Sequence, residues 1–450
     1  MNLKQLRENS KVSLGTILQT KGEGNMKITQ TAQKIKLNQV LDISVDVHKD
    51  TLNFFFETEG KEYSDECNNR TTTIMKRLET YHKIALEHRM KTLRIICEPT
   101  GQYHNKLFRT ARRMGFFTCF VNAESVVKFR VIETNDTGKT DTKDPKVIRT
   151  LGQLNKVITH RMIGEEYLVL RKLNKIYDGV DIAITSLRCR LDRLLIELFC
   201  DYSFKKDFLY SVSGLALIEQ YSCNPYRIIK AGYRDFCICM REAAPRIQQK
   251  TLQRLWEDAQ SSVLNEQPDG YIEILEMHLQ QLINDWLQQI RRKEAIVEKM
   301  IAVLQLLRGK DPHIPPSTPG VINDKNMARL LGETGPLGDF SNWRMLMRYA
   351  GLNIRMRQSG KYQGQNKITK RGRPLLRKVL QHIVLPLVRE NCLYGQYYHR
   401  KKEIEKMPGN KAMTCVARHF LKKFYGWYKS GEAFNRQRFF FSETQYKRAA

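Results

Sequence analysis

Residues 43–47 read Ile-Ser-Val-Asp-Val, and residues 93–98 read Leu-Arg-Ile-Ile-Cys-Glu. Both runs are short, rich in branched aliphatic residues and bounded by polar turns, a pattern that predicts buried strands rather than helices. Each run carries a carboxylate near its end, Asp46 in the first and Glu98 in the second. The sequence therefore predicts a sheet with acids at two neighbouring strand ends, although each acid alone is also explained by an ordinary strand-end cap.

Two further acids, Asp141 and Asp144, follow in the segment Lys-Thr-Asp-Thr-Lys-Asp-Pro at residues 139–145. They are three residues apart, so on a helix both carboxylates would point from one face. Four acids gathered in one place repel strongly, and two hard divalent cations bound through oxygen relieve that repulsion. Such a site carries out two-metal phosphodiester chemistry.

The rest of region 40–160 alternates strands with helices. We expect a strand pair at residues 43–47 and 51–57, a helix at 74–89, a strand at 92–97, a helix from 101 to about 114 and a strand at 116–121. The segment with Asp141 and Asp144 opens a last helix. This mixed α/β layer, with acids at two strand ends and on a late helix, resembles the ribonuclease H fold in the form found in RuvC-type resolvases.

The charge of the chain points to a polyanionic partner. The 450 residues include 76 Lys and Arg and 47 Asp and Glu, which gives a net charge of +29. The length predicts two to four domains, and the hydrophobic content of 41% is enough to build their cores. From residue 341 to the end there are 25 Lys and Arg and only 5 Asp and Glu, so most of the excess positive charge lies in the last quarter of the chain. A solubilising surface is the alternative explanation.

Cysteine usage and hydropathy bear on the compartment. The ten cysteines include no Cys-x-x-Cys pair, so we expect most of them to be buried in a reducing cytosol. No run of about 18 apolar residues predicts a membrane span. The sequence favours a soluble, intracellular protein without a membrane partner.

Residues 165–308 predict a helical coiled-coil region with a small helical insert at 202–268. Apolar residues recur there every three or four positions along two stretches. Such helices could fold back on one another or join two protomers, and we favour a contribution to a dimer. The seam residues are Leu170, Leu173, Tyr177, Val180, Ile184, Leu187, Leu191, Leu194 and Leu198 in the first stretch and Ile272, Leu275, Leu279, Leu282, Trp286 and Ile290 in the second.

The two ends of the chain are basic. Residues 1–39 predict a flexible arm. After a Pro-rich linker at residues 313–320, a mainly helical C-terminal domain is expected over 309–440, with helices at 326–332, 341–350, 374–388 and 412–428.

A single serine, Ser359, lies beside a glycine in the basic segment 351–361. A serine nucleophile needs a base or a metal to take its proton and positive charge to hold the phosphate. A solvated turn is the alternative for this segment alone. The cations that would hold the phosphate are Arg355, Arg357, Lys361 and Lys367.

A second basic segment, residues 370–377, predicts a turn that grips phosphate and leads into a helix, because its glycine permits close approach of the backbone. A charged helix start is the alternative. Its predicted nucleic-acid contacts are Lys370, Arg371, Arg373 and Arg377.

Taken in order, these motifs resemble the DEDD insertion-sequence transposases of the IS110 family, which also includes the pilin-inverting recombinase Piv. The similarity covers about residues 40–150 and 310–390, joined by a helical middle that the family also has. The motifs are Val45-Asp46-Val47-His48-Lys49, Glu98-Pro99-Thr100-Gly101, Lys139-Thr140-Asp141-Thr142-Lys143-Asp144, Pro319-Gly320-Val321, Tyr349-Ala350-Gly351-Leu352, Gln358-Ser359-Gly360 and Gly372-Arg373-Pro374-Leu375-Leu376-Arg377.

The resemblance implies an enzyme that recombines donor and target DNA. A RuvC-like domain would bind Mg²⁺, two ions, through Asp46, Glu98, Asp141 and Asp144. Ser359 would attack DNA and hold the cut strand as a phosphoserine. The family also uses a bridge RNA to choose its DNA by base pairing and assembles as a dimer of dimers, in which the acids of one protomer meet the serine of another. A cytoplasmic, prokaryotic protein that associates with the nucleoid when active is implied.

The sequence departs from the family pattern in two places. Ser44 replaces the usual glycine before the first strand acid, and Ile322 replaces the second glycine of the Pro-Gly-Val-Gly turn, which argues against a backbone phosphate nest there. Asp42 is interpreted as a strand-start residue, and His48 and His104 as surface or packing residues.

Three other functions compete with a transposase. A Piv-like invertase would need no guide RNA. A RuvC-type junction resolvase would need the acids but not Ser359. A nucleic-acid-binding protein without activity would need neither, and the presence of all four acids argues against it.

Overall fold

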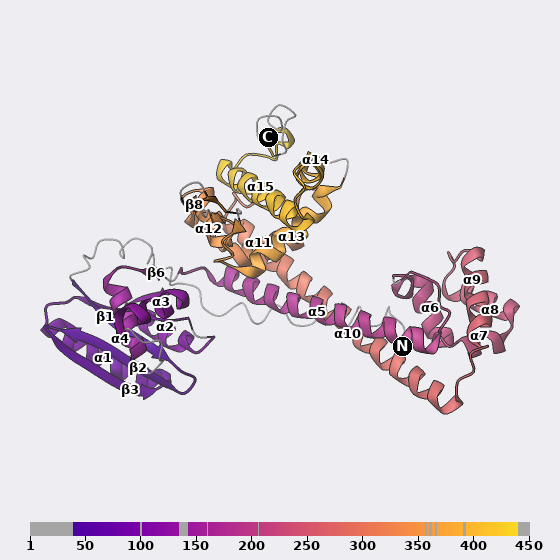
Figure 1. Cartoon of the computed structure of the whole chain (residues 1–450), viewed down its shortest axis with the longest axis horizontal. Helices are drawn as coiled ribbons and strands as arrows, with labels where there is room; N and C mark the ends of the chain where they lie inside the picture. The colour runs from indigo at the N-terminus through magenta and orange to yellow at the C-terminus, as the bar shows by residue number, and fades with distance from the viewer. Residues whose placement is uncertain are drawn as a thin grey trace. The chain divides into compact units, whose positions relative to one another are not determined.

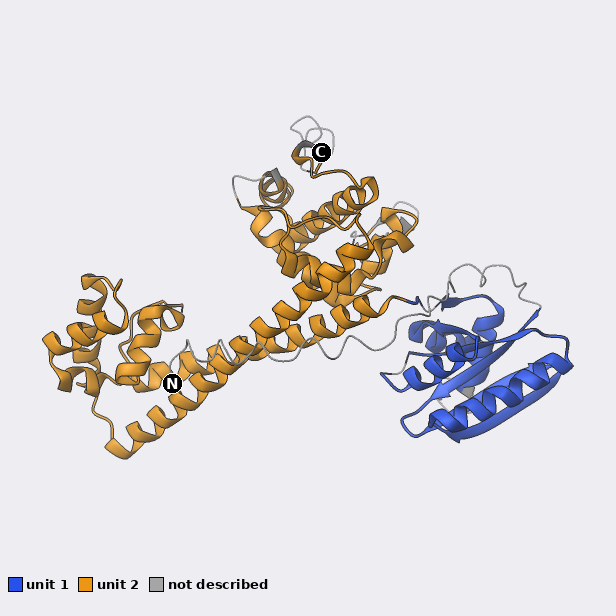
Figure 2. Ribbon diagram, turned by 180° about the vertical axis from the view of Figure 1, so that it is seen from behind, with its two compact units in different colours: residues 1–162 blue, residues 163–450 orange. Residues whose placement is uncertain are grey.

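The computed structural model describes residues 39–99, 101–134, 143–159, 161–205, 207–355, 358–359, 362–364, 367–389 and 393–439. The chain forms two compact units, residues 1–162 and residues 163–450 (Figure 2). Nearly all of the predicted basic arm, and the predicted metal ligand Asp141, lie outside the described residues.

The first unit is built on a six-stranded mixed sheet (Figure 1). Its strands are β1 (Val40–Val47), β2 (Thr51–Thr58), β3 (Lys61–Asn68), β4 (Thr92–Cys97), β5 (Phe117–Val121) and β6 (Val157–Thr159), in the order β3-β2-β1-β4-β5-β6. β1, β4 and β5 are parallel neighbours, whereas β2, β3 and β6 pair antiparallel. The predicted mixed α/β layer is thereby confirmed.

Helices cover both faces of this sheet. α1 (Thr71–Glu87) and α2 (His104–Arg113) pack on one face, against a core that includes Ile43, Val45 and Cys97. α3 (Ala123–Thr134) and α4 (Lys143–Gln153) pack on the other, against a core that includes Ile96. Every residue of β4 is buried, because successive side chains of this central strand enter opposite cores.

Three elements of this unit were not predicted: β3, α3 and β6. β3 reads Lys-Glu-Tyr-Ser-Asp-Glu-Cys-Asn and lies at the edge of the sheet, where most of its side chains remain at least partly exposed. Such an edge strand lacks the apolar run that marked β1 and β4.

Two long helices organise the second unit. α5 (Glu165–Leu198) and α10 (Asp269–Lys310) pack along each other within the chain (Figure 2). All the predicted seam residues are buried except Leu173 and Ile290, which are partly exposed. The apolar seam residues are therefore buried between helices of one protomer. A contribution of these helices to a dimer stays a prediction.

The predicted insert between these helices is helical. It contains α6 (Val212–Tyr221), α7 (Pro225–Ala231), α8 (Tyr233–Ala243) and α9 (Gln249–Ser262) after a short 3₁₀ turn at Phe208–Tyr210. The side chain of Asn224 caps α7 by accepting from the backbone N–H groups of Tyr226 and Arg227, and Pro225 occupies the first turn.

The C-terminal segment is also mainly helical, and it shares one core with α5 and α10. Two short antiparallel ribbons, β7 (Ile354–Arg355) with β10 (Lys367–Ile368) and β8 (Gln358–Ser359) with β9 (Tyr362–Gln363), interrupt the helices. The helical elements are α11 (Asp324–Thr334), the 3₁₀ turn Leu337–Asp339, α12 (Trp343–Ala350), α13 (Pro374–Val384), the 3₁₀ turn Leu385–Val388, α14 (Leu393–His399), the π-helix Arg400–Ile404, α15 (Gly409–Ser430) and α16 (Arg436–Phe439).

One departure from the family pattern is explained by packing. Ile322, at the position of the expected glycine, is buried and forms an isolated bridge with Thr318.

In the described parts of the chain, no helix combines the length and the apolarity needed to cross a membrane.

Candidate functional site

Asp46 and Glu98 lie at the same edge of the first unit's sheet. β1 and β4 run parallel with Val45 opposite Cys97, so the next residues, Asp46 and Glu98, follow at the same level. Both carboxylates also act on the Cys97 thiol, whose pKa is raised first by burial and then by the negative charges of Glu98 and Asp46. The two acids predicted from separate strands are therefore close together.

Both acids belong to the sheet face that α3 and α4 cover. Val45 and Cys97 enter the opposite core, while Ile96 enters the core under α4. Because side chains alternate along a strand, Asp46 and Glu98 belong to the face of Ile96.

The last turn of α4 lies beside the start of β1. A Cβ atom added at Gly152, near the end of α4, would lie 2.5 Å from Cδ1 of Ile96 and 3.5 Å from Oδ2 of Asp42, at the start of β1. Asp144 is eight residues earlier, about 12 Å along a helix. Asp46 is four residues along β1 from Asp42, about 13 Å along a strand. Asp144 therefore lies at the opposite end of α4 from Gly152, and Asp46 lies at the opposite end of β1 from Asp42.

Two neighbours of these acids were not predicted. Arg130, on α3, donates from Nη2 to Oδ1 of Asp144 at 2.5 Å, and both side chains are buried. Nε2 of His48 lies 3.2 Å from Oδ2 of Asp46. The only sequence signal for His48 was its place just after the strand acid, and Arg130 gave none because α3 itself was not predicted.

Asp42 has a structural role. Arg94 on β4 donates to both of its carboxylate oxygens, at 2.6 and 2.5 Å, and also to the carbonyl of Gly152 at 3.1 Å. This fork ties β1, β4 and α4 together at the edge opposite Asp46.

The three described acids do not by themselves form a finished metal site. Within the part of the chain that the structure describes, which leaves out Asp141, no group of three or more His, Cys, Asp or Glu is placed to hold a metal ion. Carboxylate oxygens are the donors that Mg²⁺ prefers, so Asp46 and Glu98 fit such a cation. Asp144 accepts from Arg130 through Oδ1, and a bound metal would share or replace that pair.

Ser359 lies in the ribbon formed by β8 and β9, opposite Tyr362. Its side chain, like Arg357 and Lys361, lies outside the described residues. β7 and β10 flank this ribbon in sequence, and the predicted phosphate contacts Arg355 and Lys367 on them are exposed. Lys370 and Arg371 are exposed as well.

Two glycines clamp the base of the serine segment. Gly351 and Gly372 have φ angles of +69° and +157°, and a Cβ at Gly372 would lie 2.4 Å from the Gly351 nitrogen. The Lys370 N–H donates to the Gly351 carbonyl at 3.0 Å, and the Arg373 N–H to the Tyr349 carbonyl at 3.2 Å. No side chain fits between the two chain segments, which explains the glycines.

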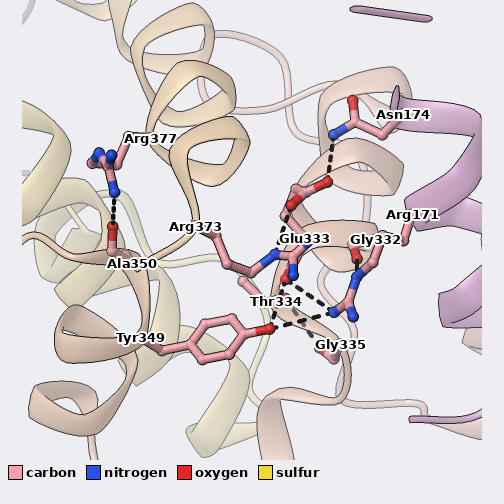
Figure 3. Close-up of polar contacts among 10 residues, drawn as sticks. All are labelled: Arg171, Asn174, Gly332, Glu333, Thr334, Gly335, Tyr349, Ala350, Arg373 and Arg377. Atoms are coloured by element: carbon pink, nitrogen blue, oxygen red, sulfur yellow. Dashed lines mark hydrogen bonds and ion pairs between the residues drawn. The ribbon is translucent and has the colours of Figure 1, made fainter. Parts of the chain in front are cut away.

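A buried carboxylate anchors this base to the rest of the second unit (Figure 3). Glu333 on α11 is fully buried; it accepts from Nε of Arg373 at 2.8 Å and from Nδ2 of Asn174 at 3.0 Å. Its backbone carbonyl accepts from the Tyr349 hydroxyl at 3.3 Å. Through these bonds α5, α11, α12 and α13 fix the segment on which Ser359 is carried.

Arg373 and Arg377 have partners inside the protein. Arg373 pairs with Glu333, and Nη1 of Arg377 donates to the Ala350 carbonyl at 3.0 Å (Figure 3). Both were predicted to contact nucleic acid, which stays a prediction; the structure gives them a role in holding the turn.

Replacing Glu333 with Gln should destabilise the second unit by roughly 1–3 kcal/mol, because the Arg373 guanidinium loses its charged partner and a buried amide replaces a carboxylate. Urea unfolding followed by tryptophan fluorescence measures this, since all four tryptophans lie in residues 163–450. The control is Glu298→Gln, an exposed position on α10 that should leave the midpoint unchanged. Equal midpoints for both variants would refute the anchoring role.

Comparison with known families agrees with this geometry. A DEDD model of the IS110 type, described as a transposase, matches residues 43–200, which contain all four predicted acids. The model described as transposase IS116/IS110/IS902 family matches residues 317–399, which contain Ser359 and both clamping glycines. No curated protein matches the chain.

The fold and the two matched regions define a DNA transposase, an enzyme whose partner is DNA. The chain belongs to the IS110 family of insertion-sequence transposases. DEDD transposases typically use a divalent metal ion.

Proposed function

We propose that this transposase cuts and rejoins DNA through a covalent phosphoserine at Ser359, with the help of a divalent-cation site formed by Asp46, Glu98, Asp141 and Asp144. The observation that supports the proposal is the position of Asp46 and Glu98, which follow the paired residues Val45 and Cys97 of two parallel strands. The strand order β3-β2-β1-β4-β5, antiparallel and then parallel, supports a ribonuclease H-like fold of the RuvC type for the first unit.

Attack by the serine conserves the energy of the DNA bond that it breaks. Its hydroxyl oxygen forms a bond to phosphorus as the bond to one DNA oxygen breaks, so a serine ester replaces a phosphodiester and rejoining needs no ATP. The rigid base at Gly351 and Gly372 limits the positions that the nucleophile can occupy. The exposed cations Arg355 and Lys367 would hold the phosphate as negative charge develops on it.

The acids supply the second part of the site. Asp46 and Glu98 would hold Mg²⁺, two ions with the help of Asp141 and Asp144. A cation held by these acids would lower the pKa of an attacking hydroxyl and would stabilise the leaving oxygen. Before a cation binds, Arg130 compensates the charge of Asp144 and keeps the first turn of α4 in place.

RNA guidance and assembly complete the proposal. A bridge RNA would select donor and target DNA by base pairing, and the strongly basic C-terminal quarter supports binding to nucleic acid. A dimer of dimers would bring the acids of one protomer to the serine of another. These two elements depend on the resemblance to the family.

The test is incubation of the protein with Mg²⁺, labelled donor DNA and the RNA transcribed from the flanking region, followed by a denaturing gel. We expect a labelled band at the mass of a protein–DNA adduct, which protease treatment removes. Cleaved DNA without an adduct would instead indicate a RuvC-type resolvase. Recombination by RNA-free protein would indicate a Piv-like invertase.

A further inference from the structure

A cavity of about 1160 Å³ lies in the second unit between the β7–β10 ribbon and the helices at Tyr397–Arg418. It is larger than the roughly 300–1,000 Å³ of typical small-molecule pockets, so it has room for a length of polymer. Its lining includes the cations Arg355, Lys367, Lys370, Lys401, Lys411 and Arg418.

The charge of the cavity is strongly unbalanced. Among the described residues that line it, none is acidic. Glu405, outside the lining, pairs with Lys401 at 2.6 Å and so compensates one cation. Nε of Arg418 is buried and has no hydrogen-bond partner among the described residues. The cavity therefore favours a ligand with several negative charges.

The cations converge on one point of the wall. The Cys415 thiol has its pKa raised by burial, and the charges of Lys401, Arg418 and Lys411 act against that rise. All three cations are thus near Cys415, although Lys401 and Lys411 come from different helical elements. Several cations clustered in one cavity suit the phosphates of a nucleic-acid backbone.

An aromatic side chain completes the wall. Tyr397 on α14 lines the cavity, and Nζ of Lys401 lies 5.5 Å from its ring centroid. Burial raises the pKa of Tyr397 to about 12, so its hydroxyl is neutral at pH 7. Lys401 is carried by the π-helix Arg400–Ile404, an irregularity that is frequent at functional sites. Cations combined with an aromatic ring are typical of sites that bind single strands, where each unpaired base offers a face for stacking.

We propose that this cavity binds a single strand of DNA, with its phosphates on Lys367, Lys370, Lys411 and Arg418 and one unpaired base against Tyr397. β7 and β10 flank the segment that carries Ser359, so the cavity would hold the strand next to the nucleophile. The assignment of the bound strand as the DNA strand that Ser359 attacks rests on the proposed function. The capacity of the cavity to bind a single strand does not rest on it.

The first experiment measures binding of a fluorescent single-stranded oligonucleotide to the full chain in EDTA, where no metal-dependent cutting occurs. Lys411→Gln/Arg418→Gln should weaken binding about 10-fold and lower the slope of log affinity against log salt by about 1.4, for two lost phosphate contacts. The matched control, Lys402→Gln/Lys429→Gln, removes two exposed cations outside the lining and should retain most of the affinity. Equal losses in both variants would overturn the site.

The second variant tests stacking. Tyr397→Leu should weaken single-strand binding roughly 5- to 100-fold with an unchanged salt slope, and Tyr397→Phe should bind like the parent. Full binding by Tyr397→Leu, or tighter binding of a duplex than of a single strand by the parent, would contradict the proposal.

Alkylation of cysteines locates the strand. Bound oligonucleotide should slow modification of Cys415 in the cavity but not of the exposed Cys189 on α5, as measured by mass spectrometry of the peptides. Stronger protection by RNA of the same sequence would assign the cavity to RNA and overturn the DNA assignment. Because Ser359→Ala protein should show the same protection, a failure here is distinct from a failure of the phosphoserine mechanism.

Discussion

Ser359→Ala protein should form no covalent adduct with DNA, and strand exchange should fall by about 10⁴-fold or more, since the loss of a serine nucleophile removes the reaction path itself. The structure gives a reason to expect a clean result. Ser359 lies in a short ribbon whose base is held by backbone hydrogen bonds at Gly351 and by the Glu333–Arg373 pair, and removal of one hydroxyl oxygen touches none of these.

The measurement is the denaturing gel with labelled DNA, read beside single-strand binding in EDTA. Binding should be unchanged, which separates lost chemistry from lost folding. Ser341→Ala is the matched control, because Ser341 is an exposed serine of the same unit. An adduct of parental amount in Ser359→Ala protein would show that another residue is the nucleophile, and a tyrosine would then be sought by mapping the labelled peptide.

The sheet could be predicted where burial alone decides the structure. β4 was predicted at residues 92–97, its observed bounds, because a strand buried on both faces must be apolar throughout. The acids Asp46 and Glu98 were recognisable because each closes such a run. β3 was missed, since an edge strand can be polar and its existence depends on the hairpin with β2.

Ion pairs between side chains of different helical elements could not be predicted from the sequence. Glu333 reads as an ordinary helical glutamate, yet it is fully buried and holds Arg373, which the sequence had suggested as a phosphate contact. The sequence around Arg130 likewise gave no sign that this residue donates a hydrogen bond to Asp144. Such pairs depend on which helices pack together in the folded protein, and local sequence patterns do not predict that packing.

Asp46→Asn should reduce DNA cleavage by about 10³-fold while the first unit stays folded. Asn has the shape of Asp without its charge, so the side chain keeps an oxygen toward His48, 3.2 Å away in the parent. What is lost is a negative ligand worth several kcal/mol of cation-mediated stabilisation, and each 1.36 kcal/mol corresponds to a factor of ten in rate. Asp50→Asn, at an exposed position in the turn after β1, is the control and should cleave normally.

A second readout separates metal binding from catalysis. A cation that binds only the folded protein raises its stability, by about 2.7 kcal/mol at a concentration 100 times the dissociation constant. Mg²⁺ should therefore raise the thermal midpoint of the parent, followed by circular dichroism, and raise that of Asp46→Asn much less. If Asp46→Asn cleaved at the parental rate, the acids at this edge would have no part in the chemistry. If it lost the metal effect but still formed the Ser359 adduct, attack by the serine would be independent of the acids, and their role would be confined to later strand transfer.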